Sequence, residues 1–430
     1  MAARQQHRIL PNIGTRRISA YSIHLRRSRH RRKVAYLNNH GPAPLRDRSF
    51  VCLNLTLFLV FANISFLYLY PLILNAMGSA LDVIGLVMGV FSCAAVLSRP
   101  IMGKLIVRNG ESRIFSIGII ASLAASICYS LVTSFGPFML LVRVVHGLGF
   151  SACVSAGFSL AARKIRPGRR TEAFSMIGVS LVCAVAFAPP LGEYLIRAWG
   201  FPSLYAAAST AAFLAGVVAL KAFQPVDPSS RQKENASVRY CRLLKDRAFV
   251  FLLISTFVFS HCQATVPNFI ALISSEKGVL SGRFFVVSNV IAIFVLLFIG
   301  KRIDRLGKLF FMKLAYPVFS LGILLIPDMI SGTCYPVPPL LYGIGIAVLF
   351  PTYNALAAGY GSQAEKPAVM ALFTATYDSG FVTGAMVSGW IAHATSLNML
   401  FRLSGICAFA GFLTVVFLPI QGPGSGNPDP

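Results

Sequence analysis

Apolar segments of about 20 residues recur along the whole chain, and they restrict its possible folds more than any other feature of the sequence. A helix rises about 1.5 Å per residue, so about 20 apolar residues cross the roughly 30 Å of hydrocarbon in a bilayer. Measured against this length, the sequence predicts twelve membrane-spanning helices, over residues 50–76, 83–103, 114–134, 137–162, 173–196, 203–223, 248–274, 281–300, 309–330, 336–360, 369–393 and 397–419.

The composition excludes an ordinary soluble protein. Hydrophobic residues make up 56% of the 430 residues, and charged residues only 12%. A typical soluble domain has roughly twice that charged share, and a soluble fold of this length has too little interior for so much apolar surface. The sequence therefore predicts an all-α integral membrane protein.

Lysine and arginine residues collect in the segments on one side of the predicted membrane. That side holds 33 of the 39 basic residues, and the other side holds four, namely Arg197, Lys277, Arg283 and Arg402. Because basic loops stay in the cytoplasm, we expect both termini and the loop at 224–247 to be cytoplasmic. The net charge of +25 thus reflects topology and gives no reason to expect nucleic-acid binding.

A polar stretch at 224–247 separates six predicted helices from the next six. The N-terminal tail carries twelve basic residues and one acid, and lacks the apolar stretch of a signal peptide. We favour a disordered tail; an arm on anionic lipid, a transit peptide and an over-extended start are the alternatives. The predicted organisation is a basic cytoplasmic tail at 1–48, a six-helix bundle at 49–223, a cytoplasmic central loop at 224–247, a second six-helix bundle at 248–419 and a cytoplasmic tail at 420–430.

The two halves share a short motif at an offset of 197 residues. Residues 103–110 read GKLIVRNG and residues 300–307 read GKRIDRLG, so five of the eight positions agree. Each copy follows the second predicted helix of its half. Internal repeats of this kind are common in secondary transporters, which bind substrate between the repeats.

Several motifs resemble those of the major facilitator superfamily, over about residues 50–420. Residues 300–308 are similar to its G-x-x-x-D-R-x-G-R loop, and residues 143–147 (RVVHG) to its fourth-helix R-x-x-Q-G pattern. Residues 189–192 (PPLG) resemble the fifth-helix G-P-x-x-G element of drug and proton antiporters, and SRPIMG at 98–103 and YDSG at 377–380 resemble a bacterial efflux-type branch. The resemblance implies two pseudo-symmetric six-helix halves and transport by alternating access.

The resemblance also implies two loops that latch the cytoplasmic faces of the halves together. Asp304 keeps the acidic position of the second loop, whereas Val107 occupies it in the first, so we expect the second loop to matter more. The implied loop residues are Gly103, Arg108, Gly110, Gly300, Asp304, Arg305 and Gly307, and the implied fifth-helix motif consists of Pro189, Pro190 and Gly192.

Ionisable side chains inside predicted spans are candidates for proton coupling, because a charge at the centre of a membrane helix costs roughly 2.5–3.5 kcal/mol. Asp378 lies nine residues into the eleventh predicted helix, and we expect it to carry the proton, with Arg143 as the cation. A permanently paired carboxylate and an arginine that clamps carbonyl groups are the alternatives. His146 lies on the same helix face as Arg143, but a hydrogen-bonded core histidine explains it equally well. For Glu193 we expect mainly an i,i+4 pair with Arg197.

Polar side chains on five predicted helices are candidates for a substrate cavity, since polar groups at membrane depth must find protein or water partners. In the family that the chain resembles, helices 1, 7, 8, 10 and 11 line the cavity. The alternative for each residue is a hydrogen bond that joins two helices. The candidates are Asn63, Tyr68, His261, Gln263, Asn289, Tyr342, Asn354 and Tyr377.

These observations favour a secondary active transporter, namely a proton-coupled exporter of a small organic molecule. A proton-coupled importer of a sugar or organic acid and a non-transporting membrane scaffold or receptor are the alternatives. The sequence contains no Walker motif and no recognisable nucleophile–base pair or metal-ligand spacing, so we expect no enzyme activity, cofactor or metal site. We expect a monomer in the bacterial inner (cytoplasmic) membrane whose partners are lipid, protons and a small-molecule substrate.

Overall fold

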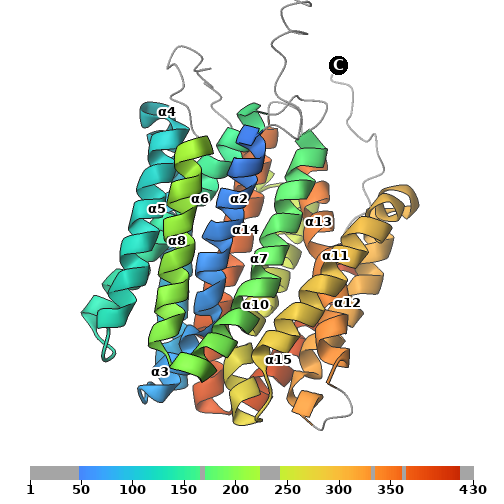
Figure 1. Ribbon diagram of the computed structural model, residues 1–430. Coiled ribbons are helices and arrows are strands. Elements are labelled where there is room, and N and C mark those ends of the chain that lie inside the picture. The colour runs from blue at the N-terminus through green and yellow to red at the C-terminus, as the bar shows by residue number, and fades with distance from the viewer. Residues whose placement is uncertain (1–47, 165–169, 223–242, 331–334, 361–364, 417–430) are drawn as a thin grey trace, which may run out of the picture.

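The computed structural model consists of long helices that run roughly side by side (Figure 1). It describes residues 48–164, 170–222, 243–330, 335–360 and 365–416. Within these ranges the chain forms helices and connecting turns, without strands. The first half comprises α2 (Arg48–Phe66), which continues through η1 (Leu67–Leu69) and α3 (Tyr70–Ala76), followed by α4 (Leu81–Asn109), α5 (Glu111–Cys128), η2 (Tyr129–Leu131), α6 (Pro137–Lys164), α7 (Arg170–Trp199) and α8 (Pro202–Ala222).

The second half repeats this plan of six helical segments. Its first helix starts after Asp246, whose carboxylate accepts hydrogen bonds from the Ala248 and Phe249 amides, as an N-cap does. The elements are α10 (Arg247–Glu276), α11 (Ser281–Leu306), α12 (Lys308–Leu324), η5 (Ile326–Ile330), α13 (Val337–Gly359), α14 (Lys366–Ala394) and α15 (Leu397–Val416).

The predicted fold class is confirmed: the described chain is all-α, with two halves of six helical segments each. All twelve segments start within three residues of their predicted positions, whereas α4 and α11 extend beyond the predicted ends to Asn109 and Leu306. Ten of the segments are long and apolar enough to cross a membrane by length and composition. Of the other two, α12 has only 17 residues and α14 carries Asp378 among several hydroxyl side chains. The predicted tails and most of the central loop lie outside the described residues.

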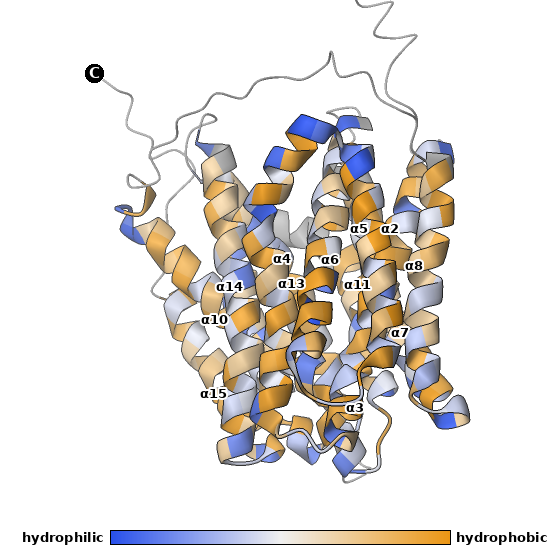
Figure 2. Cartoon of the chain, turned by 90° about the vertical axis from the view of Figure 1, so that its left-hand side faces the viewer, coloured by the Kyte–Doolittle hydropathy of each residue, from blue (hydrophilic) through white to orange (hydrophobic). Residues whose placement is uncertain are grey.

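Apolar side chains cover the outside of the bundle as well as its interior. Figure 2 shows hydrophobic residues along the middle of the helices and hydrophilic residues concentrated toward their two ends. Large apolar side chains such as Leu97 and Phe298 are 70% and 68% exposed. Such exposure is unfavourable in water and favourable in hydrocarbon, so the structure supports the membrane location that the composition predicts.

The repeated loop motif has the same backbone geometry in both halves. Gly110 ends α4 with φ +86°, and Gly307 separates α11 from α12 with φ +105°. A residue with a side chain is strained in this left-handed region, which explains why both copies end in glycine. The side chains of 299–306, including Asp304 and Arg305, lie outside the described part, so the importance of Asp304 stays a prediction.

The two halves pack closely together at the end of the bundle where α3 ends, which we call the α3 end (bottom of Figure 1). A Cβ atom on Gly85 of α4 would lie 2.6 Å from the Cα of Gly389 on α14, and the reverse holds for Gly389. At the same contact between α4 and α14, His393 Nδ1 lies 3.6 Å from Asp82 Oδ1. Small residues here let the two backbones touch, as in other close-packed membrane helices.

We predict that Gly389→Ala lowers the melting temperature of the purified protein, because the added methyl group overlaps the α4 backbone. Overpacking of this kind costs about 1–3 kcal/mol. A Cβ atom added to Gly178 of α7 would have no atom within 4 Å, so Gly178→Ala is the matched control. It should melt at the same temperature as the parent. Equal melting of the two variants would show that the Gly85–Gly389 contact does not limit stability.

Candidate functional site

An ion pair joins the two halves inside the bundle. Arg99 of α4 contacts Asp378 of α14 through Nη1 and Oδ2, and the Asp378 side chain is only 10% exposed. The Arg99 side chain is 33% exposed. Since α4 belongs to the first half and α14 to the second, any movement that separates these helices must break or rearrange this pair.

The cation beside Asp378 in this structure is therefore Arg99, and the role of Arg143 as the coupling cation stays a prediction. Arg143 is 1% exposed, and its Nε donates to the carbonyl oxygen of Val87 at 2.9 Å. Its guanidinium also lies over the rings of Tyr70 and Phe91, at 5.4 and 5.3 Å from their centroids. A carbonyl and two ring faces stabilise a desolvated cation, so Arg143 clamps α6 to α4 within the first half.

His146 belongs to a hydrogen-bonded chain in the core of the first half. Asn63 uses its amide nitrogen to donate to Ser126 Oγ and to the Ala208 carbonyl, both at 2.8 Å. Its Oδ1 therefore accepts from His146 Nε2 at 2.8 Å, which assigns the hydrogen to Nε2 and leaves Nδ1 to accept from Tyr129 at 3.3 Å. Arg143 Nη1 donates to the same Tyr129 hydroxyl. Each member has a protein partner, which favours the core role of His146 and Asn63.

Three of the predicted cavity residues meet near the ion pair, and we call them the central cluster: Gln263, Tyr342 and Tyr377. Tyr377 donates to Gln263 Oε1 at 2.9 Å, and Tyr342 donates to the Gln263 carbonyl oxygen at 3.4 Å. Tyr377 precedes Asp378 on α14, so the cluster adjoins the ion pair. Tyr68 of the first half lies close enough to Tyr342 and Tyr377 to interact with them electrostatically. Its ring stacks on that of Phe285 of α11, with 5.9 Å between the ring centroids.

The remaining cavity candidates lie apart from the central cluster or bond within their own helix. His261 Nδ1 lies 3.2 Å from Thr383 Oγ1, which links α10 to α14. Asn289 donates to the Phe285 carbonyl at 2.7 Å, and Asn354, which is half-buried, donates to the Phe350 carbonyl at 2.9 Å. Each of these two asparagines bonds through its amide nitrogen to the preceding turn of its own helix, so they are weaker candidates.

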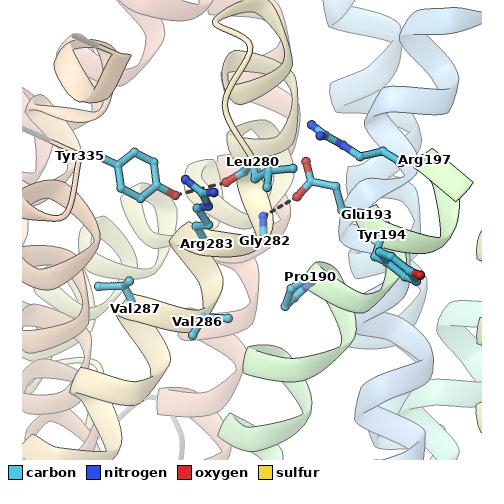
Figure 3. Close-up of a pocket in the computed structure, with 10 residues that line it drawn as sticks. All are labelled: Pro190, Glu193, Tyr194, Arg197, Leu280, Gly282, Arg283, Val286, Val287 and Tyr335. Carbon is cyan, nitrogen blue, oxygen red and sulfur yellow. Dashed lines mark hydrogen bonds between the residues drawn. The ribbon is translucent and has the colours of Figure 1, made fainter. Parts of the chain in front are cut away.

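Glu193 does not pair with Arg197 as expected; its carboxylate reaches across to the second half (Figure 3). Oε2 accepts from the Gly282 amide at 2.8 Å and Oε1 from the Ser281 amide at 3.3 Å, at the first residues of α11. A helix N-terminus has unpaired N–H groups and a partial positive charge. The Glu193 carboxylate is therefore stabilised more by the start of α11 than by the exposed side chain of Arg197. Glu193 is consequently 9% exposed and links α7 to α11 at the α3 end.

The proline motif makes this contact possible. A Cβ on Gly282 would lie 2.5 Å from the Cα of Pro190, so the start of α11 rests directly on α7. Gly192 faces the other way, toward Leu204, Leu69 and Phe66 of the first half. The motif thus provides close packing on both sides of α7.

Arg99 is the functional candidate that sequence reasoning missed. It lies within a predicted helix, so the charge count of 33 against four assigns it to neither side of the membrane, and a residue ten positions before the end of α4 can still reach the membrane surface. The available signal was its place in the Ser98-Arg99-Pro100 motif, one of the two stretches that resemble the efflux-type branch, Asp378 being in the other. In the first loop motif, a Cβ on Gly103 would meet no atom of the described residues within 4 Å, and Arg108 is exposed.

Known proteins resemble this chain over most of its length. It is 23% identical over 370 residues to the staphylopine export protein of Staphylococcus aureus, covering 82% of this chain and 91% of that protein. It is 22% identical over 339 residues to the multi-drug resistance efflux pump PmrA of Streptococcus pneumoniae, covering 75% and 82%. Among solved structures, the nucleoside transporter NupG superposes with a TM-score of 0.70 at 15% identity, over 86% of this chain and 99% of that one.

The human organic anion transporter MFSD10 has the same fold, with a TM-score of 0.64 at 17% identity over 87% of this chain and 100% of that one. The sequence model of the Major Facilitator Superfamily matches residues 51–359, which is more than half of the chain. Together with the two six-helix halves, this match shows that the chain belongs to the Major Facilitator Superfamily.

Proposed function

We propose that this chain is a secondary active exporter that couples the outward movement of a small organic molecule to the inward movement of protons. The observation that carries the proposal is the Arg99–Asp378 ion pair, which bridges the halves beside the central cluster. The names of two relatives, an export protein and an efflux pump, favour the outward direction. The charge distribution of the loops supports placing the α3 end outside the cytoplasm.

Asp378 is the proton carrier in this proposal. As a carboxylate it holds Arg99 and thereby α4 against α14; as a neutral acid it loses most of this attraction and frees the guanidinium. Proton binding and the separation of the two helices are then linked, because each favours the other.

The central cluster is the proposed substrate site. Gln263, Tyr342 and Tyr377 offer amide and phenol groups from the second half, while Tyr68 approaches from the first. Flat aromatic rings with polar tips suit a small organic molecule that is partly apolar. In this structure the halves meet at the α3 end, through Gly85 with Gly389 and through Glu193 with Gly282, so that end acts as the closed gate.

The proposed topology can be tested with reporter fusions to the full chain. After Gly200 and Glu276, a reporter that works only outside the cytoplasm should be active. Within 225–245, a reporter that works only in the cytoplasm should be active, since 33 of the 39 basic residues lie on that side. An inner-membrane protein with both termini in the cytoplasm requires this pattern. The opposite pattern would reject the orientation.

Asp378→Asn should abolish substrate accumulation driven by a pH gradient, while substrate exchange without a gradient persists. Asparagine keeps the size of the side chain but cannot bind or release the proton, and it leaves Arg99 unpaired. Flux is measured in inside-out and right-side-out vesicles, which also separates export from import. Asp328→Asn is the control, because Asp328 pairs with Arg402 at an exposed position 2.8 Å away. Normal uphill transport by Asp378→Asn would make Asp378 a structural residue.

Glu193→Gln should shift the protein toward a state that is open at the α3 end. Glutamine can still accept a hydrogen bond from Gly282, but it loses the charge at the α11 N-terminus, which is worth about 1 kcal/mol or about fivefold in population. Spin labels at Ser203 of α8 and Met399 of α15, in a variant without native cysteines, report the distance between the halves there. Glu276→Gln removes an exposed charge at the same end and serves as control; a shift of equal size in both variants would contradict the gate role of Glu193.

A further inference from the structure

We propose that the headgroup of an anionic phospholipid binds in a pocket of about 440 Å³ on the outer side of the α7–α11 contact (Figure 3). We call it the seam pocket. It goes beyond the transport function proposed above and uses only the proposed orientation of the chain in the membrane. Its lining comes from both halves: Pro190, Glu193, Tyr194 and Arg197 from α7, and Leu280, Gly282, Arg283, Val286, Val287 and Tyr335 from the second half.

Positive charge is concentrated in the seam pocket. Only four basic residues lie on this side of the membrane, and two of them, Arg197 and Arg283, line this one pocket from opposite halves. Within the described part of the chain neither forms an ion pair, whereas Arg402 on the same side pairs with Asp328. The carboxylate of Glu193 accepts hydrogen bonds from the first amides of α11. The two guanidinium groups are therefore available to bind one phosphate.

The seam pocket lies at the depth of lipid headgroups. Tyr194 lines it, is 63% exposed and packs edge-on against Trp199, the last residue of α7, at 6.4 Å between ring centroids. Exposed tyrosine and tryptophan residues at helix ends mark the membrane–water interface. Tyr335 closes the opposite wall, where its hydroxyl donates to the Leu280 carbonyl at 3.2 Å. Burial raises the pKa of Tyr335 to about 12, so this wall stays neutral and does not repel an anion.

An apolar track leads from the seam pocket toward the middle of the membrane. Val286, which lines the pocket, is 39% exposed, and Val290 and Phe294 follow on the same face of α11 with 43% and 54% exposure. Residues spaced by four lie above one another on a helix, so the three form one stripe beneath the arginines. This arrangement suits a phosphate that carries acyl chains better than it suits a free phosphate ion.

Because both halves form the seam pocket, the lipid binds one conformation. Arg197 lies on α7 and Arg283 on α11, and the contact of Glu193 with Gly282 holds these helices together. A transporter that opens at this end must separate them and divide the pocket. A ligand that needs both arginines therefore stabilises the closed state and slows opening at this end.

Binding is tested on the delipidated full chain by native mass spectrometry during titration with phosphatidylglycerol or phosphatidylethanolamine. We expect one phosphatidylglycerol to be retained selectively, and the double variant Arg197→Gln/Arg283→Gln to weaken its retention by about tenfold. Lys277→Gln, which removes a charge from the same side but outside the pocket, should bind like the parent. Arg197→Lys/Arg283→Lys keeps the charge and should retain most of the binding.

The outcomes separate the alternatives. Equal retention by the parent and the double glutamine variant would overturn the proposal, and so would equal loss in the Lys277→Gln control. Displacement of the lipid by inorganic phosphate at matched concentration would reject the lipid in favour of a free anion. If Arg197→Gln/Arg283→Gln unfolds, the parent and Arg197→Lys/Arg283→Lys still allow the retention of phosphatidylglycerol and phosphatidylethanolamine to be compared. If neither protein retains phosphatidylglycerol selectively, the site is rejected. Since no transport is measured, failure here leaves the exporter proposal untouched.

Discussion

Hydrocarbon offers no hydrogen-bond partner, so every charge placed in a spanning helix must be neutralised or bonded inside the protein. Arg143 meets this requirement within one half, through the Val87 carbonyl, Tyr129 and two ring faces. Arg99 and Asp378 meet it through each other, across the two halves. The contacts of Arg143 stabilise the first six-helix bundle by itself. The pairing of Arg99 with Asp378 instead makes the stability of these charges depend on how the two bundles are arranged.

The contacts between the halves are of a kind that can be broken without unfolding either half. At the α3 end, Gly85 meets Gly389 and Gly282 meets Pro190 through backbone packing, which gains only dispersion energy. Glu193 adds two hydrogen bonds to a helix N-terminus. Each of these terms is about 1 kcal/mol or less, and their sum is comparable to what a proton or a bound substrate can offset.

Surroundings, rather than residue type, separate the roles of the arginines. Arg143 is enclosed by carbonyl and aromatic groups and forms no ion pair with any described residue, which fits a structural clamp. Arg99 faces a carboxylate that can gain or lose a proton. Arg197 and Arg283 lie at the membrane boundary beside Tyr194 and above apolar side chains, where an anionic headgroup supplies the missing charge.

The sequence by itself determined the helices, because their length, their apolar character and their glycine boundaries are local properties, as Gly110 and Gly307 illustrate. It also showed that Asp378 lies deep in a helix and that Glu193 and His146 are unusual where they stand. Which groups they contact was decided only by tertiary structure. Asp378 meets Arg99, 279 positions away, and Glu193 prefers the amides of α11 to Arg197 one turn along its own helix. Such partners depend on which faces of distant helices meet, and periodicity within one helix carries no information about that.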